Sequence, residues 1–389
     1  MRLAPCLIVL LSVSSPVAAR AADDSGKKPF ELVRELQVFQ DQVVLKSDKA
    51  RAEQRERIAN VAAQLATFDA SAWADARNAR AAVIYVLSGG DPRVLRKLFA
   101  SGAPLGVDER LAKGALAYGE RRDAEATELL EGIDVDALDR SVGGHVALVR
   151  ALLVAKSDQR KAYALLDRAR IVAPGTIVEE AALRRQAILA AKMDDLDSFE
   201  ALSDQYFRRF SASIFARSFA HQFAEEAVSR RYSGNEKHMA KLEVLLRGMS
   251  PDMRRDACLA LAEEGIAVAN VDVVRLAGKM AALDAKAQPL DAVRLMLFEA
   301  AALIVTDDHE QGEMALRLVD RSKLGVREEA LLDAALSVAR EISRPPMLGA
   351  ATPEEAVSGE PPDAASSTVI NDARRAIARA DGLLNEASR

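Results

Sequence analysis

Four histidines are the first residues in this sequence that could hold a metal or move a proton. They are His145, His221, His238 and His309. No two of them are close in sequence and no cysteine pair accompanies them, so the spacing of a zinc site is absent. His309 and Glu310 match the start of a helical zinc-protease motif, but Glu313 stands where that motif has its second histidine. The sequence therefore predicts no metal site.

Patterns for nucleophilic and phosphate chemistry are equally weak. Ser25 and Lys28 have serine–lysine spacing but lie in a polar leader. Gly89-Gly90 suggests a phosphate loop, yet it follows an expected helix and no Lys-Ser/Thr comes after it, which favours a turn. The many carboxylates are typical of solvated helix faces. We therefore expect a non-enzymatic protein with no catalytic residue and no cofactor.

The elements that would position any site are helices. Hydrophobic residues make up 50% of the 389 residues but aromatics only 4%, which suits close-packed helices better than sheets. The large apolar residues that recur every 36 positions are Leu130, Leu166 and Leu202. Around the second of these, Ala162, Ala169 and Pro174 match a tetratricopeptide-like pattern. One helix pair cannot bury its own apolar stripe, so we predict an all-α helical-repeat array, a solenoid.

The repeat pattern is loose, and one stretch inside it is aromatic. Gly114, Ala126 and Ser198 supply small residues where helices of a pair approach, but Arg150 and Gln186 stand where the pattern has glycine. An irregular superhelix is expected. The aromatic stripe consists of Phe207, Phe210, Phe215, Phe219 and Phe223. It has two interpretations, an exposed docking groove or core packing, and we favour the core.

The first 21 residues have the form of a signal peptide. Arg2 precedes an apolar run over residues 3–13, and Ala19-Arg20-Ala21 offers a cleavage site. The alternative is an uncleaved anchor, but the run is shorter than the ~20 residues that span a bilayer. We expect an exported, periplasmic chain that starts near Ala22. Cys258 would then be its single cysteine, and its apolar neighbours predict a buried, inert thiol.

The remainder divides into four segments. Residues 22–107 form an N-terminal helical region, in which Trp73 is expected to be a packing anchor, Asn78 to cap one helix and Asp91 to cap the next. Residues 108–343 form the repeat domain. Residues 344–367 are a proline-rich linker. Residues 368–389 form a C-terminal amphipathic helix, with an apolar seam, that must dock to be stable.

The charge balance excludes a nucleic-acid binder. There are 58 acidic and 53 basic residues, a net charge of −5. Five arginine pairs are expected to be solvated helix edges, with contact to an acidic partner as the alternative. They are Arg121-Arg122, Arg184-Arg185, Arg208-Arg209, Arg230-Arg231 and Arg254-Arg255.

Three stretches resemble the MotC family, the periplasmic motility proteins of rhizobia and related α-proteobacteria. They are PFELVRELQVFQDQ (29–42), RNARAAVIYVLSGGDPRVL (77–95) and NDARRAIARAD (371–381). The resemblance implies a non-enzymatic role in chemotaxis and flagellar rotation through the periplasmic part of the stator protein MotB. It assigns no partner-binding residues. Alternatives are an unassigned periplasmic scaffold, a carrier that uses the phenylalanine stripe to hold a hydrophobic ligand, or a glycan enzyme with a carboxylate pair.

Overall fold

A computed structural model describes residues 26–46, 49–102, 104–229, 232, 235–284 and 289–343. The expected signal peptide, the proline-rich linker and the C-terminal amphipathic helix lie outside these residues. The described part contains seventeen α-helices and three short 3-10 helices, with no strand. The all-α helical prediction is therefore confirmed.

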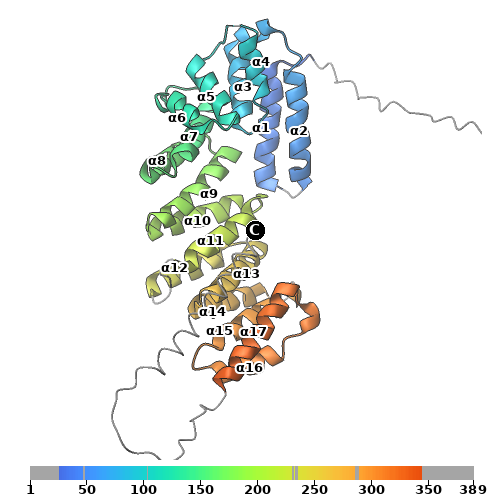
Figure 1. Ribbon diagram of the computed structural model, residues 1–389, viewed down its shortest axis with the longest axis vertical. Helices are drawn as coiled ribbons and strands as arrows, with labels where there is room; N and C mark the ends of the chain where they lie inside the picture. Colours follow the sequence, from blue (N-terminus) through green and yellow to red (C-terminus); the bar gives the residue numbers. More distant parts are fainter. Residues whose placement is uncertain are drawn as a thin grey trace, which may run out of the picture. The chain divides into compact units, whose positions relative to one another are not determined.

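The helices follow one another in short steps along the chain (Figure 1). The first eight are α1 (Pro29–Lys46), α2 (Lys49–Leu65), α3 (Ala76–Leu87), α4 (Arg93–Ala100), α5 (Glu109–Gly119), α6 (Asp123–Glu131), α7 (Arg140–Val154) and α8 (Gln159–Val172). The next five are α9 (Ile177–Lys192), α10 (Leu196–Phe210), α11 (Ala216–Ser229), α12 (Glu236–Gly248) and α13 (Pro251–Ala267). The last four are α14 (Val271–Ala281), α15 (Pro289–Leu303), α16 (His309–Arg317) and α17 (Val326–Ile342). The 3-10 helices are η1 (Ala70–Ala74), η2 (Ala282–Asp284) and η3 (Arg321–Lys323).

From α3 onward the helices pair and the pairs stack. The two helices pack on each other in α3–α4, α5–α6, α7–α8, α9–α10, α13–α14 and α15–α16. Neighbouring pairs are joined through their first helices, since α11 packs against both α9 and α13, and α15 packs against α13 and α17. Second helices also meet, as α12 does with α10 and α14. This layering forms a helical-repeat array, while the tetratricopeptide-like register stays a prediction.

Four turns inside pairs share one backbone motif. Gly89, Arg121, Asp194 and Ala269 each have a positive φ. The N–H of the following residue then bonds the carbonyl five residues back, as from Arg122 to Ala117 at 2.9 Å and from Asn270 to Gly265 at 2.8 Å. This left-handed C-cap satisfies the last carbonyls of the first helix and reverses the chain into the second. The prediction that Gly89-Gly90 is a turn is confirmed.

Several predicted helix starts are corrected. Asp75, not Asn78, caps α3, and Asn78 instead accepts a hydrogen bond from the N–H of Phe30 at 3.2 Å. The N-cap of α4 is Pro92, one residue after the predicted Asp91, although the Asp91 carboxylate accepts from the N–H of Arg93, the first residue of α4, at 2.9 Å. At the start of α16, Asp308 makes no side-chain cap bond, and its carboxylate pairs with Arg275 at 2.7 Å. A side chain that makes a long-range contact is not available to cap the helix next to it.

The leucines with 36-residue spacing lie in the shared core, as predicted. Leu130, Leu166 and Leu202 are all buried, each on the second helix of its pair. A Cβ on Gly114 would come within 2.5 Å of the side chain of Leu130, so that position of α5 requires a residue without one. The predicted close approach of helices at Gly114 is confirmed.

The phenylalanine stripe belongs to this core. Phe207, Phe210, Phe219 and Phe223 are buried, and Phe215 is half-buried. The ring of Phe207 lies 5.2 Å from that of Phe219 and 5.4 Å from that of Phe223, in the range of favourable aromatic contacts. The core interpretation is therefore confirmed and the exposed docking groove is wrong. Cys258 is fully buried in the same cluster, as predicted.

Long polar side chains fill the places where glycine was expected. The guanidinium of Arg150 donates to the carbonyls of Ile133 at 2.7 Å and Glu131 at 2.8 Å. Gln186 is buried. Two arginine pairs are not the solvated edges that were predicted. Arg184 is half-buried beside the fully buried Glu180 at 3.2 Å, and Arg255 is half-buried beside Asp291 at 3.1 Å. Arg184 and Glu180 lie one turn apart on α9, whereas the pair of Arg255 with Asp291 connects α13 to α15.

Helix α1 connects the start of the chain to its middle. It packs against α3 and α9 as well as α2. Val44 is fully buried in the same cluster as the phenylalanines of α10 and α11. The carboxylate of Asp41 accepts a hydrogen bond from the N–H of Ile177, the first residue of α9, at 2.8 Å. Burial raises the pKa of Asp41. An N-terminal helix thus caps a helix 136 positions further on.

Truncating the core leucine tests this packing. Leu166 is 3% exposed among residues of α7 and α9. Leu166→Ala should lower the free energy of unfolding by about 2–5 kcal/mol, because it removes buried methyl groups and leaves a cavity. Urea denaturation measures the loss. The control is Leu318→Ala, since Leu318 is 77% exposed and should change stability by about 0.5 kcal/mol or less. Equal losses would contradict the observed packing.

Candidate binding groove

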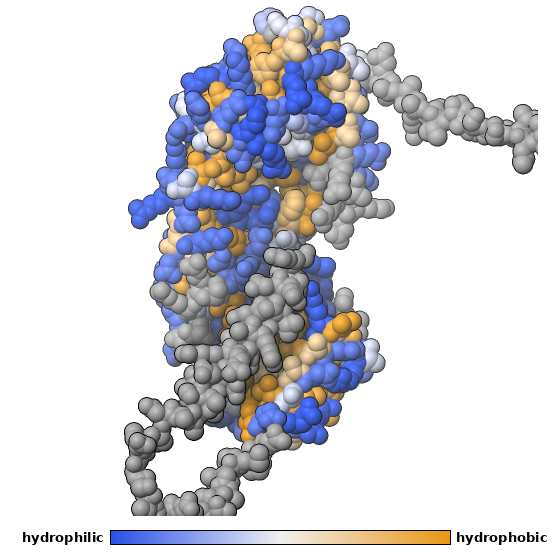
Figure 2. All heavy atoms as spheres, in the orientation of Figure 1, coloured by the Kyte–Doolittle hydropathy of each residue, from blue (hydrophilic) through white to orange (hydrophobic). Residues whose placement is uncertain are grey.

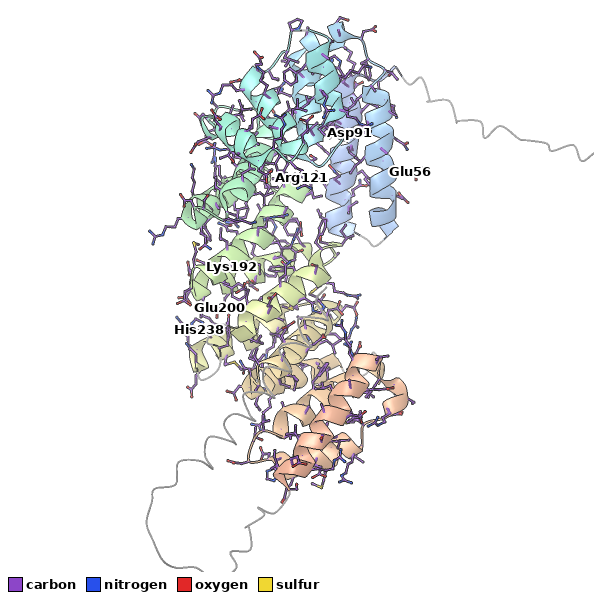
Figure 3. The ribbon with its side chains drawn as sticks, viewed as in Figure 1. Glu56, Asp91, Arg121, Lys192, Glu200 and His238 are labelled. Atoms are coloured by element: carbon purple, nitrogen blue, oxygen red, sulfur yellow. The ribbon has the colours of Figure 1, made fainter. Side chains whose placement is uncertain are left out.

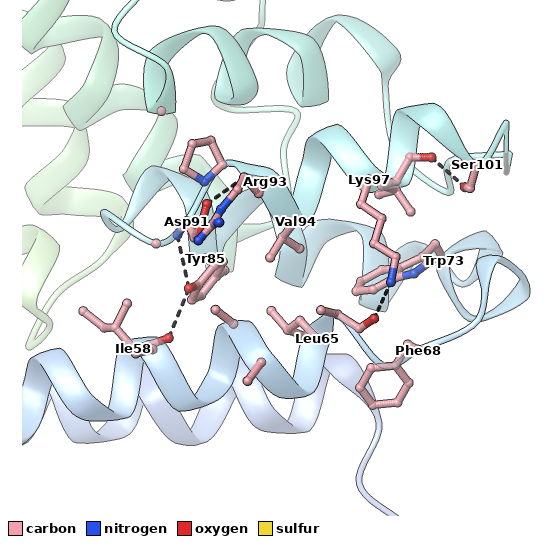
Figure 4. A pocket seen from close by; sticks show the side chains of 18 of the residues that line it. Ile58, Leu65, Phe68, Trp73, Tyr85, Asp91, Arg93, Val94, Lys97 and Ser101 are labelled. Carbon is pink, nitrogen blue, oxygen red and sulfur yellow. Dashed lines mark hydrogen bonds and ion pairs between the residues drawn. The ribbon is translucent and has the colours of Figure 1, made fainter. Parts of the chain in front are cut away.

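A recess in the described part of the chain lies between α2 and the α3–α4 pair (Figure 4). Its volume is about 950 Å³. One wall is the face of α2 from Ile58 to Ala66. The other runs from Gly89 through α4 to Ser101. We call this recess the α2–α4 groove. Its size is in the range of sites that hold a drug-sized ligand or a few side chains of a partner.

The floor of the groove is apolar and buried. Trp73, in η1, is 5% exposed and makes an edge-to-face contact with Phe68, with ring centroids 6.2 Å apart. Tyr85, Val94 and Leu98 are buried beside it. The prediction that Trp73 is a packing anchor is confirmed. The structure adds that this anchor also forms part of an open recess.

Hydrogen bonds from Tyr85 and Lys97 run across the groove and fix its width. The hydroxyl of Tyr85 donates to the carbonyl of Ile58 at 3.1 Å and accepts from the N–H of Asp91 at 3.1 Å. Burial raises the pKa of Tyr85, which keeps the hydroxyl protonated. The ammonium of Lys97 donates to the carbonyl of Ala66. Since α2 packs mainly against α1, these bonds hold it opposite α4.

The Gly-Gly turn shapes one end of this groove. Gly89 has φ +90°, which favours glycine. A Cβ on Gly90 would lie 2.5 Å from the ring and the carbonyl oxygen of Tyr85. Asp91 is held by Arg93, and that guanidinium lowers the pKa of the Asp91 carboxyl. The Gly89-Gly90 turn and Asp91 therefore form one end of the recess.

A second constellation joins α10 and α12 (Figure 3). Asp197, Glu200 and His238 bring potential metal-ligand atoms within 4.8 Å of one another. Glu200 accepts from the hydroxyl of Tyr232 at 3.0 Å and contacts Nδ1 of His238 at 2.7 Å. Residue spacing did not predict this group, because Glu200 and His238 lie 38 positions apart.

Lysines already balance the charge of this cluster. Lys241 pairs with Glu200 at 2.9 Å and also with Asp197, and Lys237 pairs with Asp197 at 3.3 Å. These ammonium groups lower the pKa of Asp197, while burial and the Glu200 carboxylate raise the pKa of Tyr232. Because cations repel a metal ion, we interpret the cluster as an ion-pair network between consecutive repeats.

The other histidines are dispersed. His145 is buried in α7, with Nδ1 3.2 Å from the carbonyl of Ser141. Burial lowers the pKa of His145 to about 4. His221 is exposed on α11, and His309 is half-buried at the start of α16. None of these three is in the group of potential metal ligands found among the described residues.

Hydrophobic side chains are also exposed on the last helices. They include Met314 on α16, Leu318 just after that helix, and Val326, Val338 and Ile342 on α17. Figure 2 shows hydrophobic surface along this end of the array. In the described part of the chain, no helix combines the length and the hydropathy needed to cross a bilayer.

Comparison with known proteins identifies the family. The model of the family described as chemotaxis protein MotC matches residues 1–389, the whole chain. This chain belongs to the MotC family. Chemotaxis protein MotC of Rhizobium meliloti (strain 1021) is 30% identical over 347 residues, which cover 88% of this chain and 79% of that protein. No solved structure matches the chain. As a MotC-family member, the protein is associated with chemotaxis and motility. The stretch 77–95, which resembles the family, covers most of α3, the Gly89-Gly90 turn and the start of α4, and so part of one wall of the groove.

Removing one hydroxyl tests how the groove is held. Tyr85→Phe leaves the carbonyl of Ile58 and the N–H of Asp91 without their partner, which should cost about 1–3 kcal/mol of stability. Amide protons of α2 should exchange faster with solvent. Tyr118→Phe is the control, since Tyr118 is half-buried and its hydroxyl has no hydrogen bond within the described ranges. Unchanged exchange in α2 for Tyr85→Phe would contradict this role.

The buried histidine predicts a pH dependence of stability. His145 has a pKa of about 4 when folded, against about 6.5 when unfolded. The unfolded chain therefore binds more protons between these values, and stability should fall as the pH drops from 6.5 towards 4, by on the order of 3 kcal/mol from this residue. Urea denaturation at pH 7 and pH 4.5 measures it. His145→Gln should show a smaller decrease, whereas the exposed-site control His221→Gln should match the wild type.

Proposed function

We propose that this protein is a non-enzymatic periplasmic component of the flagellar motor. In this role it binds and stabilises the periplasmic part of the stator protein MotB and is required for rotation. The observation that carries the proposal is the match of the MotC family model over all 389 residues. The sequence-based interpretation of residues 1–21 as a signal peptide supports the location.

The architecture suits a binding protein. Stacked helix pairs bury their own core and leave long exposed faces for a macromolecular partner. The polar clusters that the structure brings together connect helices, as the hydrogen bond of Tyr206 to Glu180 and the ion pair of Glu200 with Lys241 do. A carrier that uses the phenylalanine stripe is disfavoured, because those rings pack against one another in the core.

Deletion of the gene tests the motor role. Cells should assemble flagellar filaments that do not rotate, because the stator lacks its stabilising partner. Electron microscopy counts filaments and swimming assays measure motility, with complementation by the wild-type gene as the control. Normal swimming, or the absence of filaments, would contradict the proposal. A periplasmic scaffold without a motor role would then be the better interpretation.

A further inference from the structure

The α2 wall of the α2–α4 groove presents small residues in a helical pattern. Ala59, Ala62, Ala63 and Ala66 follow the spacing i, i+3, i+4, i+7 and line the recess. Ala59, Ala63 and Ala66 are exposed. Alanines at this spacing on a groove wall allow a second helix to approach closely, with axes about 8 Å apart. From Ile58 to Ala66 the wall is about 12 Å long, which corresponds to roughly two helical turns.

The opposite wall supplies apolar contact and positive charge. Val94 and Leu98 are buried at its base, while Arg93 and Lys97 are exposed at its rim. Asp91 is the acidic residue of the lining, and it is already engaged by Arg93. Within the described ranges, the ammonium of Lys97 bonds a backbone carbonyl and has no ion pair. The rim therefore has an excess of positive charge that a carboxylate would complement.

We propose that the α2–α4 groove is the docking site for a short amphipathic helix of the stator partner. Two or three large apolar side chains at i, i+4 and i+7 enter between the alanine wall and Leu98, over Trp73. An acidic residue of that helix faces Lys97 and replaces its bond to the carbonyl of Ala66. This inference rests on the proposed function and assigns it a surface and a partner chemistry.

Filling the groove tests the inference. The full chain is titrated with the purified periplasmic region of MotB, and calorimetry measures affinity. Ala63→Phe should weaken binding at least about tenfold, because the ring occupies the space of the incoming side chains. The matched control is Ala201→Phe, since Ala201 is an exposed alanine on α10. It should bind within about twofold of the wild type. Circular dichroism checks that both variants keep their helical content and thermal midpoint.

Charge reversal tests the second part. Lys97→Glu should lower the affinity for MotB further than Lys97→Gln, because it repels the acidic residue as well as removing its partner. The same change should also reduce the salt dependence of binding. Equal affinity of wild type, Lys97→Gln and Lys97→Glu would overturn the assignment of an acidic residue at this edge.

The outcomes separate the inference from the function. If the wild type binds MotB and Ala63→Phe binds equally well, the groove inference is overturned and the proposed function stands. If the wild type does not bind, both are overturned. If solvent extraction releases a hydrophobic compound from the wild type but not from Ala63→Phe, while both bind MotB, the groove belongs to a small ligand and the helix inference is wrong.

Discussion

The structure depends on apolar stripes that no single helix pair can bury alone. Leu130, Leu166 and Leu202 reach the core only because a neighbouring pair covers them. Close approach is part of the same constraint. Gly114 makes room for Leu130, and a Cβ on Gly265 would lie 2.8 Å from Val274. Stacking is thus a condition of folding, and the exposed faces that remain are available for a partner.

Helix α2 departs from this rule, and the groove is the result. It packs mainly against α1, which is itself bound to the array through Val44 and Asp41. Opposite α4, α2 is held by hydrogen bonds to its backbone carbonyls from Tyr85 and Lys97. The alanine face of α2 lies opposite α4 without close helix–helix contact, so the packing of this face is incomplete. A third helix would complete it with the contacts that the repeats make among themselves.

Buried carboxylates give the array its polar ties. Glu180 on α9 bonds the hydroxyl of Tyr206 on α10 at 2.7 Å, and Glu200 on α10 bonds that of Tyr232 at 3.0 Å. Both acids are buried and both have a cation beside them, Arg184 for Glu180 and Lys241 for Glu200. Charged groups in a core require such partners, because desolvation without pairing is costly. This explains carboxylates at positions where a sequence pattern suggests solvent.

The features that could be predicted from the sequence alone depend on local interactions. These features are helix periodicity, the Gly89-Gly90 turn, the bond from the N–H of Arg93 to Asp91 and the 36-residue spacing of leucines. Each depends on neighbours a few positions away or on a simple repeat. The family, too, was recognisable from its residues. Only the tertiary structure shows the groove, across which Lys97 bonds the carbonyl of Ala66, and the contact of Glu200 with His238. The same is true of the hydrogen bond from the N–H of Ile177 to the carboxylate of Asp41. Those contacts depend on how pairs stack, and side-chain spacing along one helix does not encode which distant surface it meets.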